Sequence, residues 1–258
     1  MNQHQSKNDL PRRYLSHLTS FNMNYMHLRN PLIVAWWSAA FPGFGHLMLG
    51  KYLKGYMLLL WEVVINTFSK LNEAMVYSFT GQFDLARTSL NKRWLLLYIA
   101  VYIHSIWDSY RLTIETNKLT RLGRRAGSPI QSLEIGAYSI NFLDKRNPLL
   151  AVAWSMLMPG LGHLYLHLIP TGFLLLCWTI IQVVMSHFLE AFYYTMTGSF
   201  REATAVIDAE WALFLPSLYG YAIYESYVTA VEYNNLFRRE QAQHLRNEYQ
   251  SESFDMPL

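Results

Sequence analysis

The sequence has little charge and almost no cysteine. Charged residues make up 15% of its 258 positions, whereas a soluble domain carries roughly 25%. The deficit is uneven, because residues 147–189 contain no Asp, Glu, Lys or Arg. A soluble helix needs a polar face along its length, so an uncharged stretch this long predicts contact with lipid. The one cysteine, Cys177, has no partner in the chain, which excludes an internal disulfide.

The rest of the composition narrows the class of protein. A net charge of +3 is too small to indicate a nucleic-acid partner, and 52% hydrophobic residues is too many for a disordered chain. Mean hydropathy is only +0.07, but the chain has 18 Tyr and 8 Trp, which lower that value. Both side chains are favoured where a membrane meets water. We therefore expect an integral membrane protein whose main partner is the lipid bilayer.

The chain repeats itself at an offset of 117 residues. Asn-Pro-Leu at 30–32 recurs at 147–149, and Pro-Gly-Phe-Gly-His-Leu at 42–47 recurs as Pro-Gly-Leu-Gly-His-Leu at 159–164. The same register continues without a gap through the pairs Gly55/Gly172, Trp61/Trp178, Glu73/Glu190, Trp94/Trp211 and Asn117/Asn234. This match predicts a tandem duplication. The predicted organisation is a polar cytoplasmic tail (1–29), membrane repeat 1 (30–117), a basic cytoplasmic linker (118–146), membrane repeat 2 (147–234) and a polar cytoplasmic tail (235–258).

Each repeat contains three apolar segments. They cover 31–49, 52–79 and a stretch from about Trp94 to beyond Tyr110, and then 148–166, 170–196 and 211–227. The middle segment is long enough to cross a bilayer as one helix. In the first repeat we expect it to end at Thr80 and Gly81, because Gly favours helix C-termini. Pro216 is expected to kink the last segment.

The first segment of each repeat decides the topology. Residues 31–41 favour a helix of only half a bilayer's thickness before Pro42, Gly43 and Gly45 interrupt it. If this segment spans the membrane, the chain has six spans and the second repeat is inverted. If it is re-entrant or interfacial, the chain has four spans and the repeats are parallel.

The distribution of cations favours four spans. That model places sixteen Lys and Arg residues on the cytoplasmic side and five outside, in agreement with the positive-inside rule. We therefore predict an all-α integral membrane protein, a tandem pseudo-twofold repeat of two-span helical units. A short re-entrant or broken helix precedes each unit. The expected location is the cell membrane, with both termini in the cytoplasm.

The motif Pro-Gly-x-Gly-His-Leu-x-Leu-Gly at 42–50 resembles a known sequence signature. It is similar to bacterial multi-pass membrane proteins with a Pro-Gly-x-Gly-His-x-Tyr-Leu-Gly motif and, distantly, to the two-transmembrane-helix domain family. That family's second landmark, a Trp beside an Asp, is similar to Trp107-Asp108 and more loosely to Tyr224-Glu225. In the second repeat His167 replaces the closing Gly50. The resemblance implies residence in a membrane and no particular chemistry.

Two histidines are the first candidates for function. His46 and His163 occupy equivalent positions beside the two Pro-Gly breaks, where an unpaired polar group would be costly in a membrane. They would either handle a proton or cation between the repeats, or bond to backbone carbonyls that the breaks leave free.

Three carboxylates complete the list of candidates. Asp108 and Glu225 are equivalent acids that would either be solvated and paired with cations such as Arg111, or pair with His46 and His163 respectively. Glu62 lies in the middle of an apolar segment, so it is either functional or bonded to Asn66.

The prolines and glycines of the motif have structural roles. Pro42, Gly43 and Gly45, like Pro159, Gly160 and Gly162, are expected to break the helix, and Gly55 and Gly172 to permit close helix approach. We identify no catalytic residue, cofactor or metal site, because no nucleophile elbow, Walker loop or zinc motif is present in the sequence.

The sequence favours a scaffold or accessory component of a membrane assembly over an enzyme. Its polar residues are few and its soluble segments short, and its partner would be another membrane protein. The alternatives are a small-solute or ion transporter that uses the duplicated broken helices, and an intramembrane enzyme that uses the His and acid pairs. The sequence gives no indication of the oligomeric state.

Overall fold

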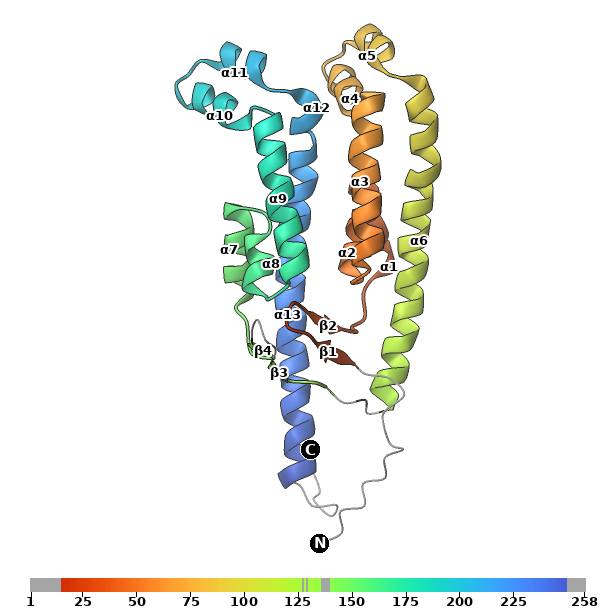
Figure 1. Ribbon diagram of the computed structural model, residues 1–258, viewed down its shortest axis with the longest axis vertical. Helices are drawn as coiled ribbons and strands as arrows, with labels where there is room; N and C mark the ends of the chain where they lie inside the picture. The colour runs from red at the N-terminus through yellow and green to blue at the C-terminus, as the bar shows by residue number, and fades with distance from the viewer. Residues whose placement is uncertain (1–14, 127, 129, 136–139, 250–258) are drawn as a thin grey trace.

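The computed structural model describes residues 15–126, 128, 130–135 and 140–249. Figure 1 shows long helices side by side along the longest axis, two β-hairpins near one end, and pairs of short helices at the other. We call these the hairpin end and the helix-pair end. The chain is mostly helical, which confirms the all-α class. The outer parts of the two predicted tails, 1–14 and 250–258, lie outside the described residues.

Residues 15–125, here called the first half, contain one hairpin and six helices. These elements are β1 (Ser16–Leu18), β2 (Met23–Tyr25), α1 (Pro31–Ala40), α2 (Phe44–Met48), α3 (Tyr52–Ser69), α4 (Leu71–Phe79), α5 (Phe83–Ser89) and α6 (Lys92–Arg125).

Residues 133–249, the second half, contain the same elements in the same order. They are β3 (Leu133–Ile135), β4 (Ile140–Phe142), α7 (Pro148–Leu157), α8 (Leu161–Tyr165), α9 (Ile169–Met185), α10 (Phe188–Met196), α11 (Phe200–Val206), α12 (Ala209–Ala212) and α13 (Phe214–Tyr249). From β1/β3 to α6/α12, each element begins 117 residues after its counterpart, which is the offset at which the sequence matches itself.

The two hairpins lie in segments expected to be a tail and a linker. Both are antiparallel, with Ser16 opposite Tyr25 and Leu133 opposite Phe142. They also bond to each other, since the Asn141 side-chain amide donates to the Thr19 carbonyl at 3.0 Å. Helix α6 also continues beyond residue 117 to Arg125. The equivalent part of each half is therefore longer than the sequence matches alone suggest.

The first apolar segment of each half is a short helix, a tight turn and a second short helix. Asn30 caps α1 by accepting the Leu32 N–H, and Pro31 supplies a pre-set first turn. After α1, Gly43 has φ +105°, and a Cβ there would lie 2.5 Å from the Gly55 carbonyl oxygen. Only glycine fits such a position. The second half repeats the arrangement with Asn147 and Gly160.

The long middle segments are broken, contrary to the expectation of single helices over 52–79 and 170–196. Lys70 adopts a left-handed conformation (φ 56°) between α3 and α4, and His187 does the same (φ 54°) between α9 and α10. A left-handed residue cannot continue a right-handed helix, so α10 turns away from α9 by 63°. The predicted end at Gly81 is present, because α4 stops at Phe79.

The predicted kink at Pro216 is instead a break just before it. Helix α12 ends at Ala212 and α13 begins at Phe214, so Pro216 lies in the first turn of α13. Proline is tolerated there because the first N–H groups of a helix have no acceptor within it.

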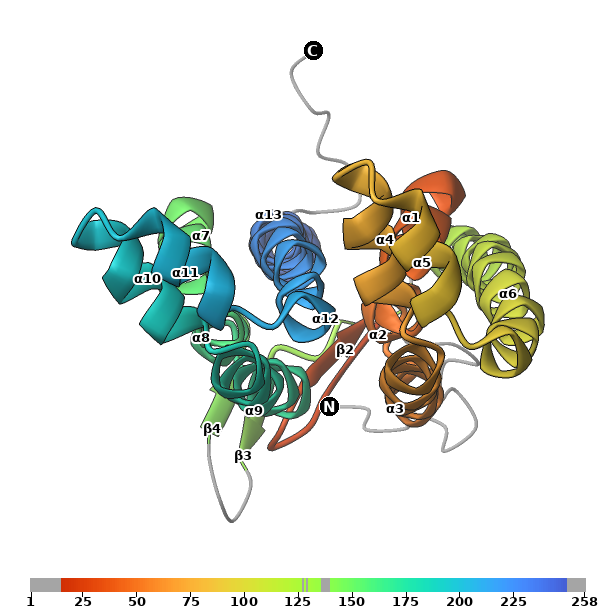
Figure 2. The same ribbon diagram turned by 90° about the horizontal axis from the view of Figure 1, so that it is seen from above.

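The two halves run in the same direction. Helices α3 and α9 rise from the hairpin end, and α6 and α13 return to it (Figure 1). Seen from above, the halves lie side by side (Figure 2). Helix α12 of the second half packs against α4 of the first, and Tyr221 of α13 contacts Trp37 of α1. The helix directions differ from the inverted second half that a six-span model requires.

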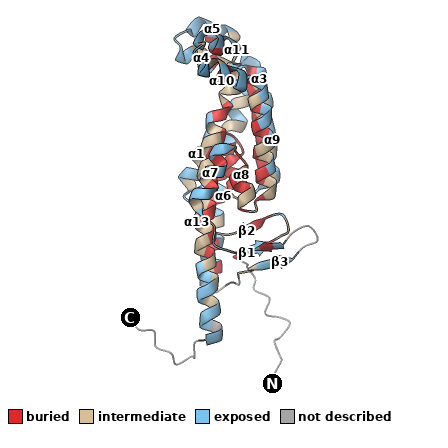
Figure 3. Ribbon diagram, turned by 90° about the vertical axis from the view of Figure 1, so that its left-hand side faces the viewer, coloured by how far each residue is buried: buried red, intermediate tan, exposed pale blue. Residues whose placement is uncertain are grey.

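Polar and apolar side chains occur both inside the bundle and on its surface. Buried residues concentrate inside the bundle, whereas the hairpin-end part of α13 is exposed (Figure 3). Many buried side chains are polar, including His46, Glu62, Asn66, Asp108 and Gln182. The exposed side chains include large apolar ones, among them Leu53, Met57, Leu60, Leu96, Leu149, Leu157, Phe173 and Val184.

No single helix in the described ranges is both long and apolar enough to count as a membrane span. Helices α9 and α10 meet that criterion together, as a bent pair.

Candidate functional site

The first half contains a charge cluster around Asp108. His46, on α2, places its Nε2 atom 3.0 Å from Oδ2 of Asp108, on α6, and both side chains are almost fully buried. Lys54 bonds to the same oxygen, and Arg111 donates to Oδ1 at 3.1 Å. The contact expected between His46 and Asp108 is therefore present. The two cations are half exposed, so the carboxylate is balanced from the hairpin-end surface.

The equivalent acid of the second half has a different partner. Glu225, on α13, forms a bidentate ion pair with Arg29, at 2.9 Å and 3.2 Å. Arg29 belongs to the first half and lies between β2 and α1. Glu225 also accepts a hydrogen bond from Thr229 at 3.3 Å. Both members of the pair are buried, with 9% and 6% of their side-chain surface exposed.

The difference between the two acids follows from two substitutions. Thr171 stands where the first half has Lys54, and Val228 where it has Arg111. Glu225 therefore has no cation within its own half at those positions, and a buried carboxylate needs one. Arg29 supplies the charge from the other half.

His163 consequently lacks the partner that the sequence suggested. Neither ring nitrogen has a hydrogen-bond partner among the described residues, and the side chain is fully buried. Its ring is stacked against Tyr221, 6.3 Å away, whose hydroxyl is also buried without a partner. The predicted contact between His163 and Glu225 is absent because the carboxylate turns to Arg29.

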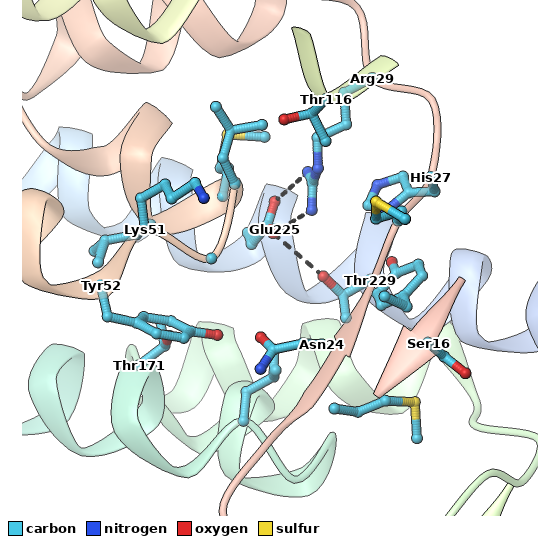
Figure 4. Close-up of a pocket in the computed structure, with 18 of the residues that line it drawn as sticks. Ser16, Asn24, His27, Arg29, Lys51, Tyr52, Thr116, Thr171, Glu225 and Thr229 are labelled. Carbon is cyan, nitrogen blue, oxygen red and sulfur yellow. Dashed lines mark hydrogen bonds and ion pairs between the residues drawn. The ribbon is translucent and has the colours of Figure 1, made fainter. Parts of the chain in front are cut away.

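A cavity of about 340 Å³ lies between the halves at the hairpin end, and its lining includes both members of the ion pair. Figure 4 shows Arg29, Glu225 and Thr229 on one side and Tyr52, Asn24 and Thr171 on another, with Lys51 beside Tyr52. The polar lining also includes His163, Tyr221, Tyr25 and His27. The cavity reaches the surface, because Lys51 and Asn24 are exposed.

Four of the aromatic lining residues share one property. Each has a side-chain polar atom that is buried without a hydrogen-bond partner in the described structure: the hydroxyls of Tyr25 and Tyr221, Nε2 of His27 and both nitrogens of His163. Buried polar groups are normally bonded.

His27 lies at the hairpin end and is stacked on Tyr25, with ring centroids 4.5 Å apart. Burial lowers the pKa of its imidazole well below the usual value, and the nearby Arg29 and Arg124 lower it further. His27 is therefore neutral at pH 7 and lines the cavity as a hydrogen-bonding group without charge.

Glu62 belongs to a separate hydrogen-bond network toward the helix-pair end. Its Oε1 atom accepts bonds from Asn66 at 3.0 Å and from Tyr98 at 3.2 Å. The Asn66 side-chain amide in turn donates to Oδ1 of Asn72 at 3.2 Å, and the Asn72 side-chain amide donates to the Glu210 carbonyl at 2.9 Å. The expected bond with Asn66 is thus present. Through Glu210 this hydrogen-bond network extends into the second half, which the sequence did not indicate.

The motif glycines lie at close contacts between helices. A Cβ on Gly45 would lie 2.3 Å from the Ser38 hydroxyl, and one on Gly162 would lie 2.1 Å from that of Ser155. Gly55 and Gly172 press against Leu47 and Leu164. The close approach expected at Gly55 and Gly172 is therefore present.

Sequence reasoning missed most residues of the cavity, among them Arg29, Lys51, Tyr52, Tyr221 and His27. Arg29 had a usable signal, since it recurs as Arg146 at the offset of 117. The others are an exposed lysine and aromatic residues of a kind that is common throughout the chain. Among the residues described, no three His, Cys, Asp or Glu side chains are grouped as a metal site would require.

Comparisons with protein-family models, curated proteins and solved structures found no match for this chain. The resemblance of the Pro42–Gly50 motif therefore remains a prediction, and a function has to be argued from the site itself.

Proposed function

We propose that this protein is an integral membrane protein that binds a small polar solute between its two parallel halves. The membrane part of the proposal is supported by the many large apolar side chains that are exposed and by the polar side chains that are buried. Helices α3 and α9, with 18 and 17 residues, are about 27 and 26 Å long, close to the roughly 30 Å hydrocarbon core. Each exposes large apolar side chains, such as Leu53 and Phe173.

The low mean hydropathy of α3 is compatible with this location. An average over a whole helix counts the inward face, and on α3 that face carries Glu62 and Asn66, which are buried and bonded. Lipid would contact only the outward face, with Met57, Leu60 and Val64. Polar residues that face the interior of a bundle are the usual arrangement in membrane proteins.

The positive-inside rule orients the hairpin end toward the cytoplasm. At the helix-pair end the described cations are Lys70, Arg87, Lys92, Arg93 and Arg201. The hairpin end has many more, including Arg29, Lys51, Lys54, Arg111, Lys118, Arg121, Arg124, Arg125, Lys145, Arg146, Arg238, Arg239 and Arg246. This unequal distribution of cations between the two ends is what four spans and two duplicated, parallel halves would produce.

Solute binding is supported by one observation: a cavity with a largely polar lining lies between the halves. The first half contributes Asn24, Arg29 and Tyr52, and the second half contributes Thr171, Glu225 and Thr229. The cavity volume of about 340 Å³ lies within the range of roughly 300–1,000 Å³ for small-molecule pockets.

Labelling of single cysteines tests the membrane arrangement. In a Cys177→Ser background, cysteine is introduced by Gln82→Cys and Arg201→Cys at the helix-pair end, and by Lys118→Cys and Arg239→Cys at the hairpin end. An impermeant thiol reagent applied to sealed membranes should label the first two from one side and the last two from the other. Labelling of residues 82 and 201 from opposite sides would mean inverted halves. Release of the protein by carbonate would exclude membrane insertion.

A matched pair of tyrosine variants tests solute binding. The hydroxyls of Tyr221 and Tyr233 are both buried without a partner among the described residues, but Tyr221 belongs to the cavity lining and Tyr233 does not. Both Tyr221→Phe and Tyr233→Phe should stabilise the empty protein. Thermal unfolding is then measured in nanodiscs with a panel of sugars, amino acids, carboxylates and phosphate. A ligand of the cavity stabilises the wild type and Tyr233→Phe but has less effect on Tyr221→Phe. If no solute distinguishes the two variants, the cavity is only a hydrated gap.

A role as an accessory component of a membrane assembly is the second candidate. It is supported by exposed apolar side chains at equivalent positions of the helix pairs: Phe79 and Met196, and Phe83 and Phe200. A photo-crosslinking residue in place of Phe83 or Phe200 should then give one stoichiometric adduct in native membranes, and the same residue in place of Leu149 should give none. Equal crosslinking at all three positions would indicate random lipid-phase contacts. That the protein is not an enzyme remains a prediction.

A further inference from the structure

We infer that the β3–β4 hairpin docks on the first half of a second copy of this chain, so that copies associate head to tail. This inference goes beyond solute binding and does not depend on it. It is based on how the β1–β2 hairpin is seated within the chain, because the duplication leaves an equivalent hairpin face and an equivalent acceptor surface exposed.

The β1–β2 hairpin of the first half packs on the second half. Leu18 and Met23, which lie opposite each other in this hairpin, are buried in a cluster whose other buried members all come from the second half. These include Leu166, Leu168, Tyr233 and Leu236. The turn between the strands also bonds there, since the Phe21 carbonyl accepts the Ile169 N–H at 3.1 Å. The second half therefore carries an acceptor surface for the hairpin of the half that precedes it.

The equivalent face of the β3–β4 hairpin is exposed. Leu133 pairs with Phe142 and Ile135 with Ile140, so these four apolar side chains lie on one face of the hairpin. Their exposed fractions run from 46% for Phe142 to 70% for Ile135. At the 117-residue offset this face corresponds to the face by which β1 and β2 are seated. A two-stranded hairpin needs packing against another element to be stable, and this face has none in the described structure.

The acceptor surface of the first half is open. The counterparts of the four acceptor residues named above are Leu49, Lys51, Thr116 and Leu119. All four line the cavity between the halves. Leu119 is 46% exposed, whereas its counterpart Leu236 is 6% exposed. The open side of the cavity thus corresponds to the place that a hairpin occupies in the second half.

Substitutions on the two surfaces compensate in size. Tyr25 of the first hairpin contacts Tyr233, with ring centroids 5.2 Å apart. The counterparts of this pair are Phe142 and Thr116. The first-half acceptor is therefore less bulky at this point. The β3–β4 face is larger, because Leu133 stands where the first hairpin has a serine. Close packing requires such a match of volumes.

A second copy is the occupant that this arrangement favours. The β3–β4 hairpin projects away from the helices of the first half of its own chain (Figure 2). Within the chain, a hairpin is seated on the following half while both halves run in the same direction. Repetition of that step places the next copy in the same orientation in a membrane. Such a contact joins two different surfaces, so it produces a ring or an open array. The seated hairpin would also close the open side of the cavity.

Crosslinking between single-cysteine variants tests the contact. In the Cys177→Ser background, chains with Phe142→Cys and chains with Thr116→Cys carry different tags and are co-expressed, and a short bis-maleimide is added to the membranes. We expect a dimer that carries both tags. Ile103→Cys, at an exposed residue of α6 outside the cavity lining, replaces Phe142→Cys in the control and should give no dimer. Equal yields in the two mixtures would indicate random collision, and a dimer from Phe142→Cys chains alone would indicate a face-to-face contact. Either result overturns the inference.

The mass of the full-length protein in mild detergent tests the same two surfaces. Ile135→Lys places a charge on the hairpin face, and Leu119→Lys places one on the acceptor. Each should reduce the wild-type oligomer to monomers, because a lysine buried there would have no counter-charge. Leu245→Lys, at an exposed leucine in the last part of α13, should leave the oligomer intact. Unchanged thermal midpoints would show that the variants remain folded.

Three outcomes of these measurements would overturn the inference. An oligomer that both Ile135→Lys and Leu119→Lys retain would mean that copies associate through another surface. A monomeric wild type without crosslinks would leave the hairpin face to a different partner. A photo-crosslinking residue in place of Ile140 that labels only lipid would assign the face to the membrane surface. Solute binding by the monomeric variants is measured separately, so loss of the oligomer and failure of the proposed function are distinguishable.

Discussion

Arg29 and Glu225 join the two halves through a buried bidentate ion pair, with N–O distances of 2.9 and 3.2 Å. They lie 196 positions apart in the chain. Asp108, the counterpart of Glu225, obtains its cations within its own half. The first half is therefore electrostatically complete, whereas the second depends on a charge from its neighbour.

Removal of one member of this pair should destabilise the protein strongly. Glu225→Gln leaves the Arg29 guanidinium buried without a counter-charge, and loss of one partner of such a pair costs about 3–5 kcal/mol. The double variant Arg29→Met, Glu225→Met should recover most of that loss, because no charge then remains buried. Unfolding in detergent measures both, and Glu115→Gln, which breaks an exposed pair with Arg111, is the control. Equal losses in the single and double variants would show that the pair is not the cause.

The equivalent substitution in the first half should be milder. Asp108→Asn removes the charge that Lys54 and Arg111 share, but both side chains are 45% exposed and can turn into water. The expected loss is about 1–2 kcal/mol, as for a charge-assisted hydrogen bond. The measurement is the free energy of unfolding of the two variants, and Glu225→Gln should lower it more than Asp108→Asn does. The reverse order would contradict the asymmetry between the halves.

The glycines in left-handed conformations should differ in their tolerance of alanine. Gly81 has φ +78° and open space around it, so Gly81→Ala should cost about 1–2 kcal/mol from backbone conformation alone. Gly43 has φ +105°, and a Cβ there would lie 2.5 Å from the Gly55 carbonyl. Gly43→Ala should therefore cost at least twice as much. Melting of the two variants side by side checks this, and similar losses would mean that α2 and α3 can separate freely.

Stability should fall in mildly acidic solution because of His27. Its pKa in the folded protein is lowered below the ordinary 6.5 by burial and by Arg29 and Arg124. The unfolded chain thus takes up a proton near pH 6.5 that the folded protein takes up only at lower pH. The free energy of unfolding therefore decreases as the pH falls from 6.5 toward the folded pKa.

His27→Phe should make this pH dependence shallower while it retains the stacking on Tyr25. The measurement is the thermal midpoint between pH 8 and pH 5, and His17→Gln, at an exposed histidine, is the control. A slope unchanged by His27→Phe would assign the acid sensitivity to other groups.

The sequence located most elements, but it did not show how the two halves use them. The 117-residue offset placed the short helices 31–41 and 148–158, the Pro-Gly breaks and the start of α6 close to their observed positions. It missed the breaks at Lys70 and His187, because neither residue type signals a left-handed conformation. It also missed the hairpins, whose sequences differ between the halves except at positions such as Asn24 and Asn141.

Only part of the candidate site could be predicted, because the sequence does not show how the two halves pack. The His46–Asp108 contact follows from two residues in one half, and repeat symmetry then suggests the same contact for His163 and Glu225. Symmetry fails there because Thr171 and Val228 replace two cations. Arg29 recurs as Arg146 at the 117-residue offset, but nothing in the sequence shows that its side chain reaches the acid of the other half.

By itself the sequence determines the helical class, the two-part organisation and the apolar segments, because these depend on local composition and on matches between equivalent positions. Only the tertiary structure decides which charges meet, since an ion pair between Arg29 and Glu225 depends on how the two halves pack. The cavity is decided in the same way: its lining comes from both halves, and it exists only where they come together.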